Sequence, residues 1–252
     1  MIKSLLNNKE FMPEGKISSA IVTGIALVVA ATVFGSFYYY AQSSANKDAL
    51  AVTGSAKTQV ASDQAKLVIA LSRTAPGDAL SAGYTGMAHD LSLAEDLLKN
   101  DGIAASDIVE GPVSMNADYY DQNNPSALRY ELGQTLTLQS DDVNKVTEIS
   151  KQVPSLAAQG VVASVSSLEY YYSKLPDLRI SLLTQAVEDA KARAEKIAQG
   201  TGRSVGSVEN ASIGVVQVMS PNSVDVSDYG SYDTSSIEKD VMVTVKASFR
   251  LK

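Results

Sequence analysis

The chain has 252 residues, a formal net charge of -7 and a hydrophobic fraction of 45%. This acidic balance, without a cluster of Lys and Arg, excludes DNA or RNA as the main partner, because phosphate binding needs such clusters. The absence of cysteine excludes a disulfide framework, a thiolate zinc site and a lipid-attachment cysteine. Roughly 205 residues follow the first apolar segment, enough for one large or two small domains.

The apolar segment covers residues 17–40 and contains no charge. It is long enough to cross a hydrocarbon core of about 30 Å as a helix. Lys3, Lys9 and Lys16 precede it. The positive-inside rule therefore predicts that residues 1–16 form a cytoplasmic tail and that the rest of the chain lies outside the cytoplasm.

Both ends of the segment carry residues suited to the membrane–water interface. Lys16 stands at its start, and Tyr38, Tyr39 and Tyr40 stand at its end, where amphipathic rings anchor a helix at the headgroups. A cleaved signal peptide is the competing interpretation, with the small residues 43–45 as its cleavage site. The apolar region is longer than the 7–15 residues typical of such peptides, which favours an uncleaved anchor.

A short linker, residues 41–49, leads into a domain that we expect to span residues 50–252. Period-two and helical patterns predict its elements in turn. Helix boundaries are indicated by N-cap, Gly and Pro signals. The expected strands are 51–61, 64–75, 107–120, 128–140, 161–172, 205–219 and 237–251, and the expected helices are 78–100, 142–153 and 178–199.

Three details of these elements carry structural expectations. A polar turn, residues 121–125, joins two strands as a hairpin. The last long helix should turn its small residues inward and approach a sheet closely, with an inward set of Leu183, Ala186, Ala190, Ala194 and Ile197. The Ser- and Asp-rich segment 220–236 is expected to be a flexible loop.

Paired strands separated by helices predict an α+β fold, with a mostly antiparallel sheet and helices packed on one face. This arrangement follows one N-terminal transmembrane helix.

Catalytic patterns are weak. His89 is the single histidine, and it lies about 200° around its helix from the apolar stripe, which favours a solvated position. The glycine-rich stretch 200–206 follows a helix rather than a strand, so it is interpreted as a helix stop and not as a phosphate loop. We therefore predict no catalytic residue, no cofactor site and no metal site, and a protein that is not an enzyme.

Five loop carboxylates could supply oxygen ligands to a calcium ion. Solvated loop acids are the favoured interpretation, because the ligand spacing of a calcium loop is not kept. The carboxylates are those of Asp118, Asp121, Asp225, Asp228 and Asp233.

Five tyrosines give the best indication of a partner: Tyr119, Tyr120, Tyr170, Tyr171 and Tyr172. Consecutive residues of a strand point to opposite faces, so the last three cannot all lie in one core. Ordinary strand propensity is one interpretation. The other is a contact surface, since tyrosine is enriched at protein interfaces.

Four stretches resemble the SIMPL-domain family of bacterial envelope proteins. VTGSAKTQVASDQAKLVIALSR (52–73) is similar to the first hairpin of that family. NDGIAASDIVEGPVSM (100–115) is similar to its passage from a helix into an extended segment with tyrosine. AVEDAKARAEKIAQGTGRSVGSVENAS (186–212) resembles its Ala-rich helix and the strand that follows, and VMVTVKASFRLK (241–252) resembles its last strand.

The resemblance implies an α+β fold, an extracytoplasmic location, ring-like homo-oligomers and a link to envelope or oxidative stress. It supplies no catalytic residues. The resulting hypothesis is a non-enzymatic envelope protein, anchored by a single pass in the bacterial inner membrane, whose periplasmic domain self-associates. The alternative is a periplasmic module that binds a ligand or peptide through a groove or a sheet edge, with the small-molecule ligand unknown.

Overall fold

A computed structural model describes residues 14–45, 49–119, 128–224 and 227–252. Internal contacts divide the chain into two compact units. The first unit comprises Met1–Ala51, Ala194–Asn210 and Ser248–Lys252, and the second comprises Val52–Arg193 and Ala211–Ala247.

The first unit contains helix α1 (Glu14–Ala45), whose stretch Val22–Tyr39 is long and apolar enough to cross a membrane. Every residue of that stretch is exposed in the isolated chain, as a lipid-facing helix requires. The unit also contains a short antiparallel closure, in which Ser204 and Lys252 exchange backbone hydrogen bonds of 3.0 and 2.8 Å. The guanidinium of Arg250 donates to the carboxylate of Glu209 at 2.7 Å in the same region.

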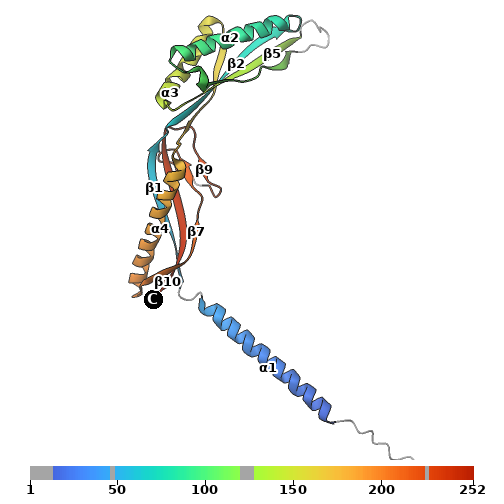
Figure 1. The fold of residues 1–252 in the computed structure, drawn as a ribbon, viewed down its shortest axis with the longest axis vertical. Coiled ribbons are helices and arrows are strands. Elements are labelled where there is room, and N and C mark those ends of the chain that lie inside the picture. The colour runs from blue at the N-terminus through green and yellow to red at the C-terminus, as the bar shows by residue number, and fades with distance from the viewer. Residues whose placement is uncertain (1–13, 46–48, 120–127, 225–226) are drawn as a thin grey trace, which may run out of the picture. The chain divides into compact units, whose positions relative to one another are not determined.

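The second unit contains a five-stranded antiparallel sheet, here called sheet B. Its path is β3-β5-β2-β6, and β4 also pairs with β5. Helices α2 (Leu80–Asn100) and α3 (Val143–Gln152) lie on one face of this sheet (Figure 1). The strands are β2 (Gln64–Pro76), β3 (Ile108–Glu110), β4 (Ser114–Tyr119), β5 (Arg129–Ser140) and β6 (Val162–Tyr171).

The main hydrophobic core lies between sheet B and its helices. Period-two alternation turns Leu67, Ile69 and Leu71 of β2 to this side, where they are fully buried. Met87 and Leu98 of α2 meet them from the helical layer. Three short 3₁₀ helices complete the layer and its connections: η1 (Gly77–Ala79), η2 (Ala105–Asp107) and η4 (Val153–Gln159).

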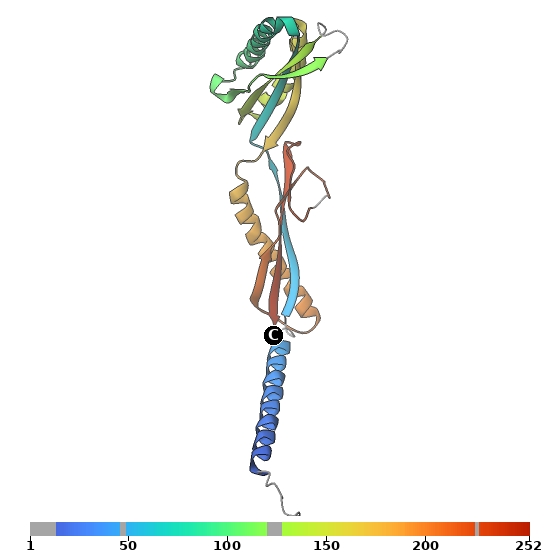
Figure 2. The same ribbon diagram turned by 90° about the vertical axis from the view of Figure 1, so that its right-hand side faces the viewer.

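A second sheet, here called sheet A, has the path β1-β10-β8-β9, and β7 also pairs with β10. Helix α4 (Leu175–Gly200) runs alongside β1 and β10 in both views (Figure 1 and Figure 2). Sheet A is mostly antiparallel, but β8 and β9 pair in parallel. The strands are β1 (Ala49–Ala61), β7 (Val205–Ile213), β8 (Gln217–Met219), β9 (Ser231–Tyr232) and β10 (Glu238–Leu251).

The predicted α+β class, with mostly antiparallel strands and helices packed on a sheet face, is confirmed. The predicted first hairpin is wrong, because β1 and β2 belong to different sheets. Residues from elsewhere hold the junction between them: the backbone N–H and hydroxyl of Ser62 donate to the carbonyl of Ile237, both at 2.8 Å. The Asp63 carboxylate accepts two bonds of 2.7 Å from Ser173.

Two predicted strands are broken at a glycine. The 107–120 strand divides at Gly111, whose N–H donates to the Thr135 carbonyl at 2.8 Å. The 205–219 strand divides at Gly214, whose N–H donates to the Thr244 carbonyl at 2.9 Å. A Cβ at either glycine would overlap the hydroxyl of the partner threonine, so any other residue there would force the threonine side chain to shift.

Helix α4 approaches β1 at Gly54. A Cβ at Gly54 would overlap the backbone of Ala186 and Ala190, which confirms the predicted close approach of the Ala-rich helix. The inward set differs from the prediction at its ends: Leu182 and Ala198 are buried, whereas Leu183 is half-buried and Ile197 exposed. The buried residues of α4 recur every four positions, at 182, 186, 190, 194 and 198. The expected set had a spacing of three at each end instead.

The Gly54→Val substitution should destabilise the domain by about 3 kcal/mol or more, because the new side chain must displace the helix backbone. Urea unfolding followed by circular dichroism measures this loss. Gly200→Ala is the matched control, since nothing lies within 4 Å of its Cβ position, and it should change stability by less than about 0.5 kcal/mol. Equal effects of the two variants would contradict the close approach.

Candidate functional site

The predicted membrane anchors are only partly described. Tyr38 and Tyr39 are exposed near the C-terminal end of α1, where they can reach an interface. Lys16 and Tyr40 lie within α1, but their side chains fall outside the described residues. One N-terminal apolar helix is therefore present, and it suits either a single-pass anchor or a signal sequence.

Among the five predicted interface tyrosines, those that the structure describes do not form one surface. Tyr119 lies in β4, opposite Arg129 of β5, and its side chain is outside the described residues, as is the whole of Tyr120. Tyr170 is buried, and its hydroxyl shares a hydrogen bond of 2.9 Å with the hydroxyl of Thr147. Only the half-buried Tyr171 and Tyr172 remain as described candidates for a surface.

A further tyrosine, which the sequence analysis did not single out, completes that surface. Tyr232 of β9 packs on Tyr171, with ring centroids 5.9 Å apart and planes inclined by 36°. The backbone N–H of Tyr172 donates to the Tyr232 hydroxyl at 3.1 Å. The hydroxyl of Tyr171 donates to the carboxylate of Glu169 at 2.7 Å. Both rings are thereby held in fixed positions.

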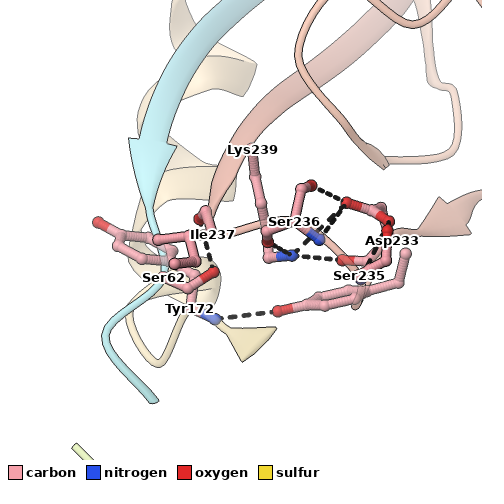
Figure 3. Close-up of polar contacts among 8 residues, drawn as sticks. Ser62, Tyr172, Asp233, Ser235, Ser236, Ile237 and Lys239 are labelled. Atoms are coloured by element: carbon pink, nitrogen blue, oxygen red, sulfur yellow. Dashed lines mark hydrogen bonds and ion pairs between the residues drawn. The ribbon is translucent and has the colours of Figure 1, made fainter. Parts of the chain in front are cut away.

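The turn that follows Tyr232, residues 233–236, is organised by a carboxylate. Asp233 accepts hydrogen bonds from the backbone N–H and the hydroxyl of both Ser235 and Ser236 (Figure 3). This part of the expected flexible segment 220–236 therefore has a defined hydrogen-bonded structure. The calcium interpretation is not supported at Asp233, because its oxygens already bind these donors.

Lys239 lies beneath this turn and is fully buried. Its ammonium donates to the carbonyls of Asp233 and Ser236 at 2.5 and 2.8 Å, and it lies 3.8 Å from the Asp233 carboxylate (Figure 3). The same ammonium lies 5.7 Å from the centre of the Tyr232 ring. The cation thus joins the turn to the tyrosine surface.

These contacts alter the pKa values of both ions. Burial alone would raise the pKa of Asp233, but hydrogen bonds from Ser235 and Ser236 and the nearby ammonium outweigh it and lower the pKa to about 2. Burial lowers the pKa of Lys239, and Asp233 offsets part of that effect. Alternation could have indicated this lysine, since it lies two residues before the buried Val241 on the same face of β10.

A groove of about 370 Å³ lies beside Tyr171, Tyr172 and Tyr232. Its floor is the face of sheet B that alternation turns away from the core, where Lys66 stands between Gln139 and Glu169 on the neighbouring strands. The lining residues are Gln64, Lys66, Gln139, Tyr171, Tyr172, Leu175 and Tyr232.

The outer edge of sheet B is a second surface of interest. Strand β6 is the last strand of the path β3-β5-β2-β6. On the side of β6 that faces away from β2, the Tyr170 N–H donates a hydrogen bond to the Thr234 carbonyl at 2.8 Å. Val162 and Val165 are exposed on this strand, and no charged residue lies between Val162 and Leu168.

Sequence reasoning also missed a buried ion pair. The carboxylate of Asp90, on α2, is almost fully buried and accepts two bonds of 2.7 and 2.6 Å from the guanidinium of Arg73, on β2. The hydrogen bonds that Arg73 donates to the Asp90 carboxylate raise the pKa of Arg73. Asp90 lies three residues after Met87 and four before Ala94, so helical spacing places Asp90 on the inward stripe of α2. His89 is exposed, as predicted.

The Asp233→Asn substitution should cost about 2 kcal/mol of stability at neutral pH, because it weakens charge-assisted hydrogen bonds from two serines. The pKa of Asp233 in the fold, about 2, is below its ordinary value of 3.8, so this stabilisation is present above pH 3.8 and is lost as the pH falls through about 2. Urea unfolding of both proteins at several pH values should show the difference shrinking across that window.

Asp228→Asn is the control, since Asp228 is an exposed carboxylate in the same segment. It should leave stability within about 0.5 kcal/mol at every pH. A pH-independent cost of Asp233→Asn would show that the charge of Asp233 does not organise the turn.

Comparisons with known proteins agree with the sequence resemblance. The SIMPL family, described as a protein of unknown function (DUF541), matches residues 50–249. No curated protein matches the chain. A crystal structure of a Burkholderia cenocepacia protein, provisionally described as an amidohydrolase/peptidase, is similar at 17% identity and a TM-score of 0.25, covering 52% of this chain and 32% of that one. Because the family match extends over nearly all of the sequence after the apolar helix, the chain belongs to the SIMPL family.

Proposed function

We propose that this protein is a non-enzymatic component of the bacterial envelope, held in the inner membrane by α1, whose exported domain self-associates into a ring. The observation that carries the proposal is the outer edge of β6. Along an open strand, N–H and C=O groups can pair with another chain, and natural proteins usually protect such edges with charged residues, proline or a cover. The stretch from Val162 to Leu168 has no charge and no proline.

The opposite edge of sheet B offers a surface that a second copy could pair with. Strands β3 and β4 follow one another along β5, and Val109 and Met115 are exposed there. Pairing of β6 in one copy with β3–β4 in the next would use two different surfaces. A contact between different surfaces closes into a ring when a whole number of copies completes one full turn without a rise along the axis.

The buried charged groups support a structural role rather than a catalytic one. Asp90 binds Arg73, and Lys239 binds the Asp233 turn. Asp240 forms an ion pair of 2.8 Å with Lys57. Each of these ions is used to join segments of the fold, which leaves it unsuited to an exchange of protons with a substrate. The link to envelope or oxidative stress that the family resemblance implies is part of the same proposal.

The orientation in the membrane can be tested with reporters fused after Lys252. An alkaline phosphatase fusion should be active and a fluorescent-protein fusion dark, because the lysines before the apolar segment retain the N-terminus in the cytoplasm. Intact mass of the purified protein should show an uncleaved chain. A fluorescent fusion with an inactive phosphatase would contradict the exported location, and loss of the first residues would contradict the anchor.

Self-association can be tested by adding a charge to the β6 edge. Native mass spectrometry of the full chain ejected directly from lipid vesicles should show a discrete oligomer, and Val162→Lys with Val165→Lys should convert it to monomers without a loss of thermal stability. Ile180→Lys is the matched control, because Ile180 is 68% exposed on α4 and Val162 is 66% exposed on β6. A monomeric native chain, or an oligomer that both variants leave intact, would refute the role of this edge.

A further inference from the structure

We infer that the groove beside Tyr171, Tyr172 and Tyr232 binds an uncharged saccharide chain. The inference stands apart from self-association, because the groove lies on the open face of sheet B and not along its edge. The volume of about 370 Å³ lies within the range of roughly 300–1,000 Å³ typical of small-molecule sites.

The two contacting rings provide an apolar surface of fixed shape. Tyr171 and Tyr232 are inclined to one another by 36°, and each is held by its own hydroxyl bond. Aromatic faces are electron-rich and attract the weakly positive C–H groups on one side of a pyranose ring. Because the rings are already ordered, little conformational entropy is lost when a ligand binds.

The remaining hydrogen-bonding capacity of the groove matches hydroxyl and amide groups. The Tyr232 hydroxyl accepts a bond from the Tyr172 N–H, so its own proton can be donated to a ligand. The Tyr171 hydroxyl donates to Glu169, so its oxygen can still accept. The exposed amide of Gln139 offers both a donor and an acceptor beside the rings.

The charges around the groove favour a neutral ligand. The Lys66 ammonium lies 3.7 Å from the Glu169 carboxylate, so the one cation among the described lining residues faces an anion of the neighbouring strand. An anionic ligand would compete with that carboxylate, and a cationic ligand would meet the ammonium. A chain of neutral sugars avoids both penalties.

An extended peptide is a poorer fit. Peptides that add to a sheet need a free backbone edge. In the groove, β2 is paired on both sides, and the Tyr170 N–H at the end of β6 is already bound by the Thr234 carbonyl. Recognition in the groove must therefore come from side chains, which suits the many hydroxyl groups of a saccharide.

Isothermal titration calorimetry of the full chain tests the inference, in a detergent without a sugar headgroup. The probes are chitotetraose and cellotetraose, with tetra-alanine as the peptide comparison. At least one saccharide should bind, and Tyr171→Ala and Gln139→Ala should each weaken its affinity tenfold or more. Tyr84→Ala, a half-exposed tyrosine on α2, is the matched control and should leave the affinity unchanged.

Tyr232→Phe separates ring from hydroxyl, and it should reduce affinity less than Tyr232→Ala does. Thermal unfolding of each variant distinguishes a lost contact from a lost fold. The inference is overturned if neither saccharide binds at about 10 mM, if tetra-alanine binds more tightly than both, or if folded Tyr171 and Gln139 variants bind like the native chain.

Discussion

The arrangement of the second unit depends most on the contacts that the buried Lys239 ammonium makes with the turn 233–236. Placing a cation in the protein interior is costly unless it is paired and hydrogen-bonded. The chain meets this requirement by folding residues 233–236 over the lysine, so that two carbonyls and a carboxylate surround it. The position of Tyr232, and with it one wall of the groove, follows from where this turn must lie.

The same turn connects sheets whose strands are far apart in sequence. The carbonyl of Thr234, in this turn, accepts a bond from Tyr170 at the end of β6, and the carbonyl of Ile237, directly after the turn, accepts one from Ser62 between β1 and β2. A junction that would otherwise be free to form a hairpin is thereby directed into two sheets. The family resemblance implied a hairpin over residues 52–73, and alternation could not correct it, because alternation reports which residues face inward but not which strand lies alongside.

Most elements of the fold could be predicted from periodicity alone. The alternation in β2 and β10 and the stripes on α2 and α4 identify the buried faces, because burial on one side imposes the same spacing on any sequence. The breaks at Gly111 and Gly214 were missed. A glycine within an apparent strand is a signal for a break, and both glycines were visible.

Tertiary contacts explain the remaining differences between expectation and structure. Asp90 and Lys239 stand on inward faces where a charged residue normally argues against burial. Each is compatible with the core because its partner comes from a distant segment: Arg73 from β2 for Asp90, and the Asp233 turn for Lys239. Only part of the tyrosine surface was predicted, for the same reason, since Tyr232 reaches Tyr171 from 61 residues away.

The bond from Tyr170 to Thr234 sets a limit on the strength of any strand addition at β6. It leaves the seven residues from Val162 to Leu168 for a neighbour, about 23 Å of strand at 3.3 Å per residue. A contact of that length would be weak between molecules diffusing in three dimensions. Confinement to a lipid plane raises the effective concentration of one copy around another, so a weak contact can be sufficient there. The apolar helix would then regulate assembly as well as location, and a released domain would separate into single copies.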